Sequence, residues 1–127
     1  MALSFSLIAV NLSTGQQAIE QQRIVRDLVS TLRYARSTAL RSHQDTFVLF
    51  DVLEHSYTWN KKTYAIPEDI GIRLQIANTQ LLNQQQARIV FFNDGSSTGG
   101  RIILTHNAVV WTINVNWLTG QIEATQQ

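Results

Sequence analysis

The chain has 127 residues, of which 44% are hydrophobic and 9% aromatic, enough apolar material for the core of one domain. Only 15% are charged and the net charge is +1, so bulk charge does not favour a nucleic-acid or membrane partner. The absence of cysteine excludes disulfides and thiolate metal sites but assigns no compartment, because a periplasmic protein need not contain disulfides.

The first ten residues form an apolar run that stops at Asn11. A membrane-spanning helix needs about 20 apolar residues, so this run cannot cross a bilayer. A signal peptide has basic residues before its apolar region, whereas no basic residue precedes this run. We expect the tail of a longer apolar segment. The alternative is a short buried strand or helix end.

A helix is predicted over residues 16–42, because apolar residues recur at spacings of three and four and no proline interrupts them. Gly15 suggests a break or flexible joint before the helix, unless the helix continues into the apolar run. The stripe consists of Ala18, Val25, Leu28, Val29, Leu32, Ala35, Ala39 and Leu40. Within it, the residues expected to form the core seam or assembly face are Val25, Leu28, Leu32, Ala35 and Ala39.

The other side of this helix carries several arginines, of which Arg26, Arg33 and Arg36 are candidates for contact with a partner. One interpretation is a solvated face whose arginine stems cover apolar neighbours. The other is a surface that meets an acidic partner or phosphate.

After residue 42 the pattern changes to strands separated by turn-forming residues. Strands are expected at residues 46–52, 57–59, 63–65, 70–76, 88–92, 101–104, 109–115 and 121–124, with a polar loop at 78–86. A helix followed by strands with short connections indicates an α+β fold with antiparallel sheet.

Searches for catalytic or cofactor chemistry give nothing positive. Residues 95–101 have phosphate-loop spacing, but Arg101 and Ile102 replace the Lys-Ser/Thr pair and a strand follows instead of a helix. His43 and Asp45 are only neighbours in sequence, and His55 has no ligand at metal-binding spacing. We therefore expect no enzyme, no metal and no cofactor.

Four segments resemble the GspH/FimT family of pilin-like proteins. Residues 32–42, LRYARSTALRS, are similar to its helix end, and residues 66–70, IPEDI, to its middle strand. Residues 91–102, FFNDGSSTGGRI, are similar to its signature "F-x-x-D-G-S-S-x-G-G-x-I", and residues 117–120, WLTG, to its closing turn. The family residues of this signature loop are Phe92, Asp94, Gly95, Ser96, Ser97, Gly99 and Gly100.

The resemblance implies a long helix packed on antiparallel sheet, with residues 1–15 a remnant of the apolar helix and 16–127 one pilin-like periplasmic domain. It also implies a minor pseudopilin of a type II secretion system. Its partners would be other minor and major pseudopilins, and the inner membrane through the full N-terminal helix. The shortened chain is expected to be monomeric. The signature loop would either touch a partner or only shape a hairpin.

The alternative is a type IV minor pilin that serves pilus assembly or DNA uptake. DNA-binding members of the family carry "G-R-x-R" near the C-terminus, where this chain has Gly120-Gln121-Ile122-Glu123. Both arginines of this motif are absent, and the carboxylate of Glu123 repels phosphate. DNA is therefore a less favoured partner than other pseudopilins.

Overall fold

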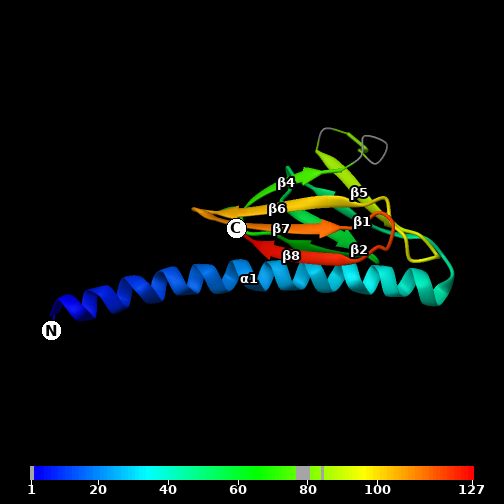
Figure 1. Ribbon diagram of the computed structural model, residues 1–127. Coiled ribbons are helices and arrows are strands. Elements are labelled where there is room, and N and C mark those ends of the chain that lie inside the picture. Colours follow the sequence, from blue (N-terminus) through cyan, green and yellow to red (C-terminus); the bar gives the residue numbers. More distant parts are fainter. Residues whose placement is uncertain (1, 77–80, 84) are drawn as a thin grey trace.

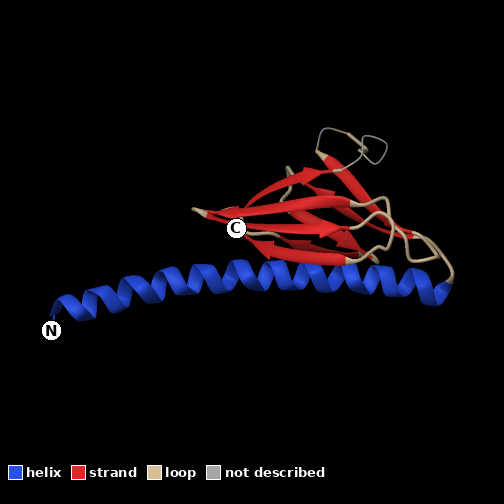
Figure 2. Ribbon diagram, in the orientation of Figure 1, coloured by secondary structure: helices blue, strands red, loops and turns tan. Residues whose placement is uncertain are grey.

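The computed structural model describes residues 2–76, 81–83 and 85–127, with side chains described from residue 19 onward. These residues form one helix followed by eight strands (Figure 1). The helix lies along one side of the molecule and the strands pack over its C-terminal half (Figure 2). This arrangement confirms the α+β prediction.

The helix α1, Ala2–Ser42, is continuous and about 60 Å long at about 1.5 Å per residue. It therefore begins well before residue 16: of the two alternatives at Gly15, the break is wrong and the continuation into the apolar run is confirmed. A single glycine in a long helix costs only about 1 kcal/mol, which neighbouring turns can offset. The helix ends where His43 adopts a left-handed conformation, with φ of 56°.

The strands form two antiparallel four-stranded sheets, with the orders β3-β2-β1-β5 and β4-β6-β7-β8. The first sheet contains β1 (Thr46–Asp51), β2 (Ser56–Trp59), β3 (Lys62–Ala65) and β5 (Gln86–Phe91). The second contains β4 (Gly71–Gln75), β6 (Gly100–His106), β7 (Val109–Val115) and β8 (Ile122–Gln126). All eight predicted strands are present, with ends shifted by one or two residues at most sites.

Turn chemistry explains the hairpin between β2 and β3. Asn60 and Lys61 join β2 to β3, and both have positive φ, 54° and 66°. Two successive positive φ values give the primed turn that matches the twist of paired strands. The loop expected over residues 78–86 lies partly outside the described residues, although Gln86 already belongs to β5.

The core lies between α1 and the two sheets. Every second residue of the central strands points into it, as the burial of Val48 and Phe50 in β1 and of Ile102 and Leu104 in β6 shows. The helix contributes five fully or almost fully buried side chains from its apolar stripe: Val25, Leu28, Leu32, Ala35 and Ala39. Leu40 lies at the margin, 37% exposed.

Candidate functional site

The signature loop connects β5 to β6, which belong to different sheets. The interpretation of this loop as a hairpin is therefore wrong. Sequence alone does not reveal this, because a Gly-rich segment between two strands is equally typical of a hairpin. The loop turns through a tight bend, in which the Gly95 amide donates to the Phe92 carbonyl at 2.9 Å and the Phe92 amide to the Ser96 carbonyl at 2.8 Å.

Asp94, itself a residue of the loop, stabilises this bend. Its Oδ1 accepts hydrogen bonds from the Ser96 amide at 3.0 Å and the Ser96 hydroxyl at 2.6 Å. These bonds favour the charged carboxylate and hold the pKa of Asp94 below its usual value. The carboxylate thus caps its own turn, in the manner of an Asx turn.

Two hydroxyl groups fasten the loop to β5. The buried Ser97 donates through Oγ to the Val90 carbonyl at 2.8 Å and accepts from the Gly99 amide at 3.0 Å. Thr98 Oγ1 accepts from the Val90 amide at 3.1 Å, and the Thr98 amide donates to the Val90 carbonyl at 3.0 Å. Ser97 and Thr98 therefore pair with the last two residues of β5, Val90 and Phe91.

The closing turn between β7 and β8 packs directly on this loop. The Ser97 amide donates to the Trp117 carbonyl at 3.0 Å, and Gly99 lies so close to Trp117 that a Cβ there would approach its backbone at 3.3 Å. Asn116 shapes the turn, because its Oδ1 accepts from the amides of Leu118 and Thr119. The signature loop and the closing turn thus meet in space.

Arg36 joins α1 to both of them. Its Nε donates to the Gly95 carbonyl at 3.3 Å and to the Thr119 carbonyl at 3.1 Å. One guanidinium therefore links the helix motif, the signature loop and the closing turn. We call this contact region, formed by Arg36, Gly95, Thr119 and Gly120, the junction. The Arg36 side chain is partly buried there, and its guanidinium contacts carbonyls of the chain itself, which neither interpretation of the arginine face includes.

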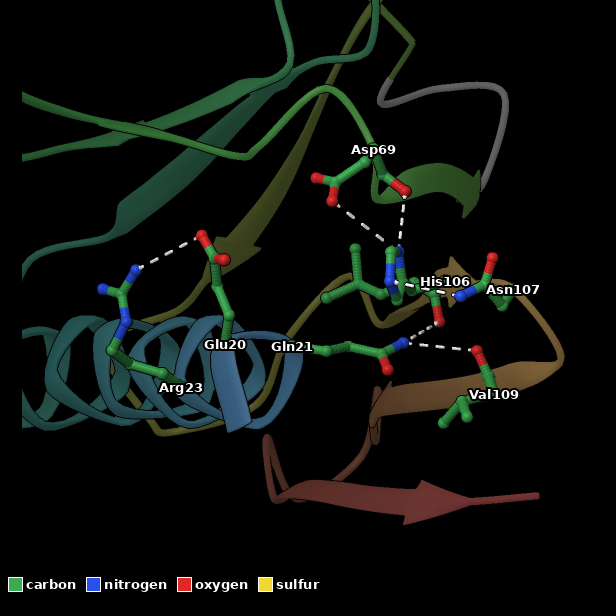
Figure 3. Close-up of polar contacts among 8 residues, drawn as sticks. Glu20, Gln21, Arg23, Asp69, His106, Asn107 and Val109 are labelled. Atoms are coloured by element: carbon green, nitrogen blue, oxygen red, sulfur yellow. Dashed lines mark hydrogen bonds and ion pairs between the residues drawn. The ribbon is translucent and has the colours of Figure 1, made fainter. Parts of the chain in front are cut away.

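A second anchor fixes the helix to the opposite end of the second sheet. Gln21 is 1% exposed, and its Nε2 donates to the carbonyls of Leu104 at 3.5 Å and Val109 at 3.2 Å (Figure 3). Beside it, His106 Nδ1 lies 3.1 Å from the Asp69 carbonyl (Figure 3). Sequence reasoning missed Gln21, although it falls four residues before Val25 and so occupies a position of the apolar stripe.

Arg26 and Arg33 lie along the seam between α1 and β8. Arg33 Nη2 donates to the Ile122 carbonyl at 3.4 Å, whereas Arg26 makes no hydrogen bond or ion pair with any residue that the structure describes. A hollow of about 500 Å³ is lined by Arg33, Arg36, Gln121, Ile122 and Glu123. A neighbouring hollow of about 370 Å³ lies between Arg26, Arg33 and Trp111.

The described residues contain no group of three or more His, Cys, Asp and Glu side chains placed to hold a metal ion. What the arrangement can do is mechanical: side-chain hydrogen bonds fix a long helix to the two ends of the second sheet, and hollows lie along the seam with β8. No helix within the described part of the chain is long and apolar enough to cross a membrane.

Comparison with known proteins decides the family. The family model for GspH, the type II transport protein, matches residues 25–120. The chain belongs to the GspH family. The match spans Arg36, the signature loop and the closing turn, so the junction is built entirely from the part of the chain that carries the family pattern.

Individual relatives agree with this family. The chain is 29% identical over 125 residues to type II secretion system protein H of Xanthomonas campestris pv. campestris, covering 98% of this chain and 74% of that protein. Its fold is similar to the minor pseudopilin EpsH from the Type 2 Secretion System of Vibrio cholerae, with a TM-score of 0.67 and 14% identity over 84% of this chain and 96% of EpsH. It is also similar to the type IV minor pilin FimU of Pseudomonas aeruginosa, with a TM-score of 0.62 and 11% identity over 86% and 90% of the two chains. As a GspH-family protein, the chain thus has the pilin-like fold that the sequence motifs imply.

Proposed function

We propose that this GspH-family protein is a minor pseudopilin of a type II secretion system, a structural subunit that helps to initiate or cap a periplasmic pseudopilus. The observation that carries the proposal is the match of the GspH family model over residues 25–120. The relative from Xanthomonas campestris, named as a type II secretion protein, supports the same assignment.

The structure suggests how such a subunit would work. In Figure 1 the N-terminal half of α1 projects well past the sheets, while the two anchors at Gln21 and Arg36 hold its C-terminal half. A rigid helix that projects from a folded domain can lead to an inner-membrane anchor and pack against the helices of other pseudopilins. The sheets would then face outward or lie at the tip of the filament, on the periplasmic side.

The proposal is tested by deleting the gene in a host that carries it and measuring the amount of a type II secretion substrate in the medium. We expect the substrate to accumulate in the periplasm and secretion to return when the gene is supplied in trans. Normal secretion together with a loss of pilus assembly or of DNA uptake would reject the proposal in favour of a type IV minor pilin.

A further inference from the structure

The groove between α1 and β8 is lined by more positive than negative charge. Arg26 and Arg33 are seven residues apart, two helical turns, so both lie on the flank of α1 that faces β8, about 10 Å from each other along the axis. Arg36 follows one turn later and lines the end of the same groove. The lining residues include three guanidinium groups and one carboxylate, that of Glu123.

Glu123 does not neutralise these arginines. Neither Arg33 nor Arg36 forms an ion pair within 4.0 Å with a described residue, and their hydrogen bonds go only to backbone carbonyls. By contrast, Arg23 of the same helix, which lines a separate hollow with Tyr57 and Tyr64, has Asp27 at 3.6 Å and Glu20 at 4.0 Å. The positive charge on the β8 side is therefore available to a carboxylate from outside the chain.

The floor of the groove is apolar. Val29 is 8% exposed, and the partly buried Trp111 and Ala124 border the hollow beside Arg26. β8 is the edge strand of its sheet and lies next to α1 (Figure 1), and the two hollows along this seam share Arg33. A matching ligand would combine apolar side chains with carboxylates spaced along one face.

We propose that this groove binds an acidic, amphipathic helix of a neighbouring pilin-like subunit, with carboxylates about seven residues apart pairing with Arg26 and Arg33. The inference rests on the proposed function, which supplies such neighbours. A duplex nucleic acid fits less well, because Glu123 lies in the groove and the chain's net charge of +1 gives little counterion release.

The test is a binding titration between this chain and each other pilin-like subunit encoded with the same secretion system, purified as its soluble domain. We expect one of them to bind, with an affinity that falls as salt is raised from about 0.05 to about 0.5 M. The double variant Arg26→Glu/Arg33→Glu should weaken this binding at least about tenfold. The matched control Arg73→Glu/Arg101→Glu, on exposed positions of β4 and β6, should change it less than about twofold.

The milder Arg26→Gln/Arg33→Gln pair guards against a folding defect, and a thermal melt should match the wild type for each variant. A lysine in place of the pairing carboxylate of the partner should restore binding to the Arg26→Glu/Arg33→Glu variant. This result would show that the two side chains pair directly. The inference is overturned if no subunit binds, or if the Arg26→Glu/Arg33→Glu variant binds as tightly as the Arg73→Glu/Arg101→Glu control. It is also overturned if duplex DNA binds these arginines more tightly than any subunit. If deletion of the gene stops secretion but the Arg26/Arg33 variants secrete normally, the proposed function stands and only this inference fails.

Discussion

Gly120 and Gly95 are packed backbone to backbone, so that a Cβ atom on Gly120 would overlap the carbonyl oxygen of Gly95. The same added atom would lie 2.8 Å from Arg36 Nε. The closing turn, the signature loop and the helix can therefore meet only because position 120 has no side chain. This contact gives a physical reason for a glycine at the end of the WLTG turn.

Replacing Gly120 with alanine should destabilise the domain by about 2 kcal/mol or more, because it combines steric overlap with a left-handed backbone. The φ of Gly120 is 73°, a region that costs an L side chain about 1–2 kcal/mol even without a clash. Denaturant unfolding gives the free energy directly.

Gly71→Ala is the matched control for Gly120→Ala. A Cβ there would meet its nearest neighbour, the Thr105 carbonyl oxygen, at 3.7 Å, and the position is exposed. We expect its effect to stay within about 0.5 kcal/mol. Equal stabilities for the two variants would mean that the close packing at Gly120 does not exist in solution.

Replacing Arg36 with methionine should lower the free energy of unfolding by about 1–3 kcal/mol. The apolar stem is kept, but the carbonyls of Gly95 and Thr119 lose a charged donor. Arg41→Met removes an arginine whose bonds to described residues stay within its own helix, to Ser37 and Thr38, and should be nearly neutral. If the two variants unfold at the same denaturant concentration, Arg36 is not an anchor.

The sequence predicts most of the elements, because their signals are local. The stripe from Val25 to Ala39 has helical spacing, and Val109, Trp111, Ile113 and Val115 recur at every second position. The sequence leaves the helix start open because Gly15 is a poor helix former, whereas a glycine inside a long helix costs only about 1 kcal/mol. The helix propensity of a single residue is therefore a poor predictor of where a long helix begins.

The junction could not be predicted from spacing. In the sequence, Arg36 is 59 residues from Gly95 and 83 residues from Thr119. No local pattern places these residues together. Sequence reasoning found all three motifs separately, through resemblance, but assigned the arginine to a surface and the loop to a hairpin. The missing information was that β5 and β6 belong to different sheets.

Leu32→Ala should cost about 2–5 kcal/mol, since Leu32 is fully buried between α1 and the sheets and its removal leaves a cavity. Tyr34→Ala, two residues away on the same helix, removes a side chain that is 63% exposed and should cost far less. Thermal melts of the two variants provide the comparison. An unchanged melting temperature for Leu32→Ala would contradict the burial of the stripe.

Stability should fall at alkaline pH because of Tyr57. Burial raises the pKa of Tyr57 from 10.0 to about 12. Below pH 10 both states hold the proton, whereas between pH 10 and 12 the unfolded state loses it and the native state keeps it. The free energy of unfolding should therefore drop across this window, by up to about 2–3 kcal/mol from this group. Tyr57→Phe should flatten the slope, and Tyr34→Phe, at an exposed position, should leave it as in the wild type.

Amide hydrogen exchange in the Arg36→Met variant tests most directly whether one arginine holds two distant loops together. In the wild type the amides of Ser97 and Gly120 are bonded to the carbonyls of Trp117 and Asn116 and should be protected. Loss of Arg36 should accelerate exchange at both amides together, and by more than at the amides of the β1–β2 pair, which should change only as far as the loss of global stability requires. Unchanged rates at both, or acceleration at only one of them, would contradict the account of the junction as a single unit.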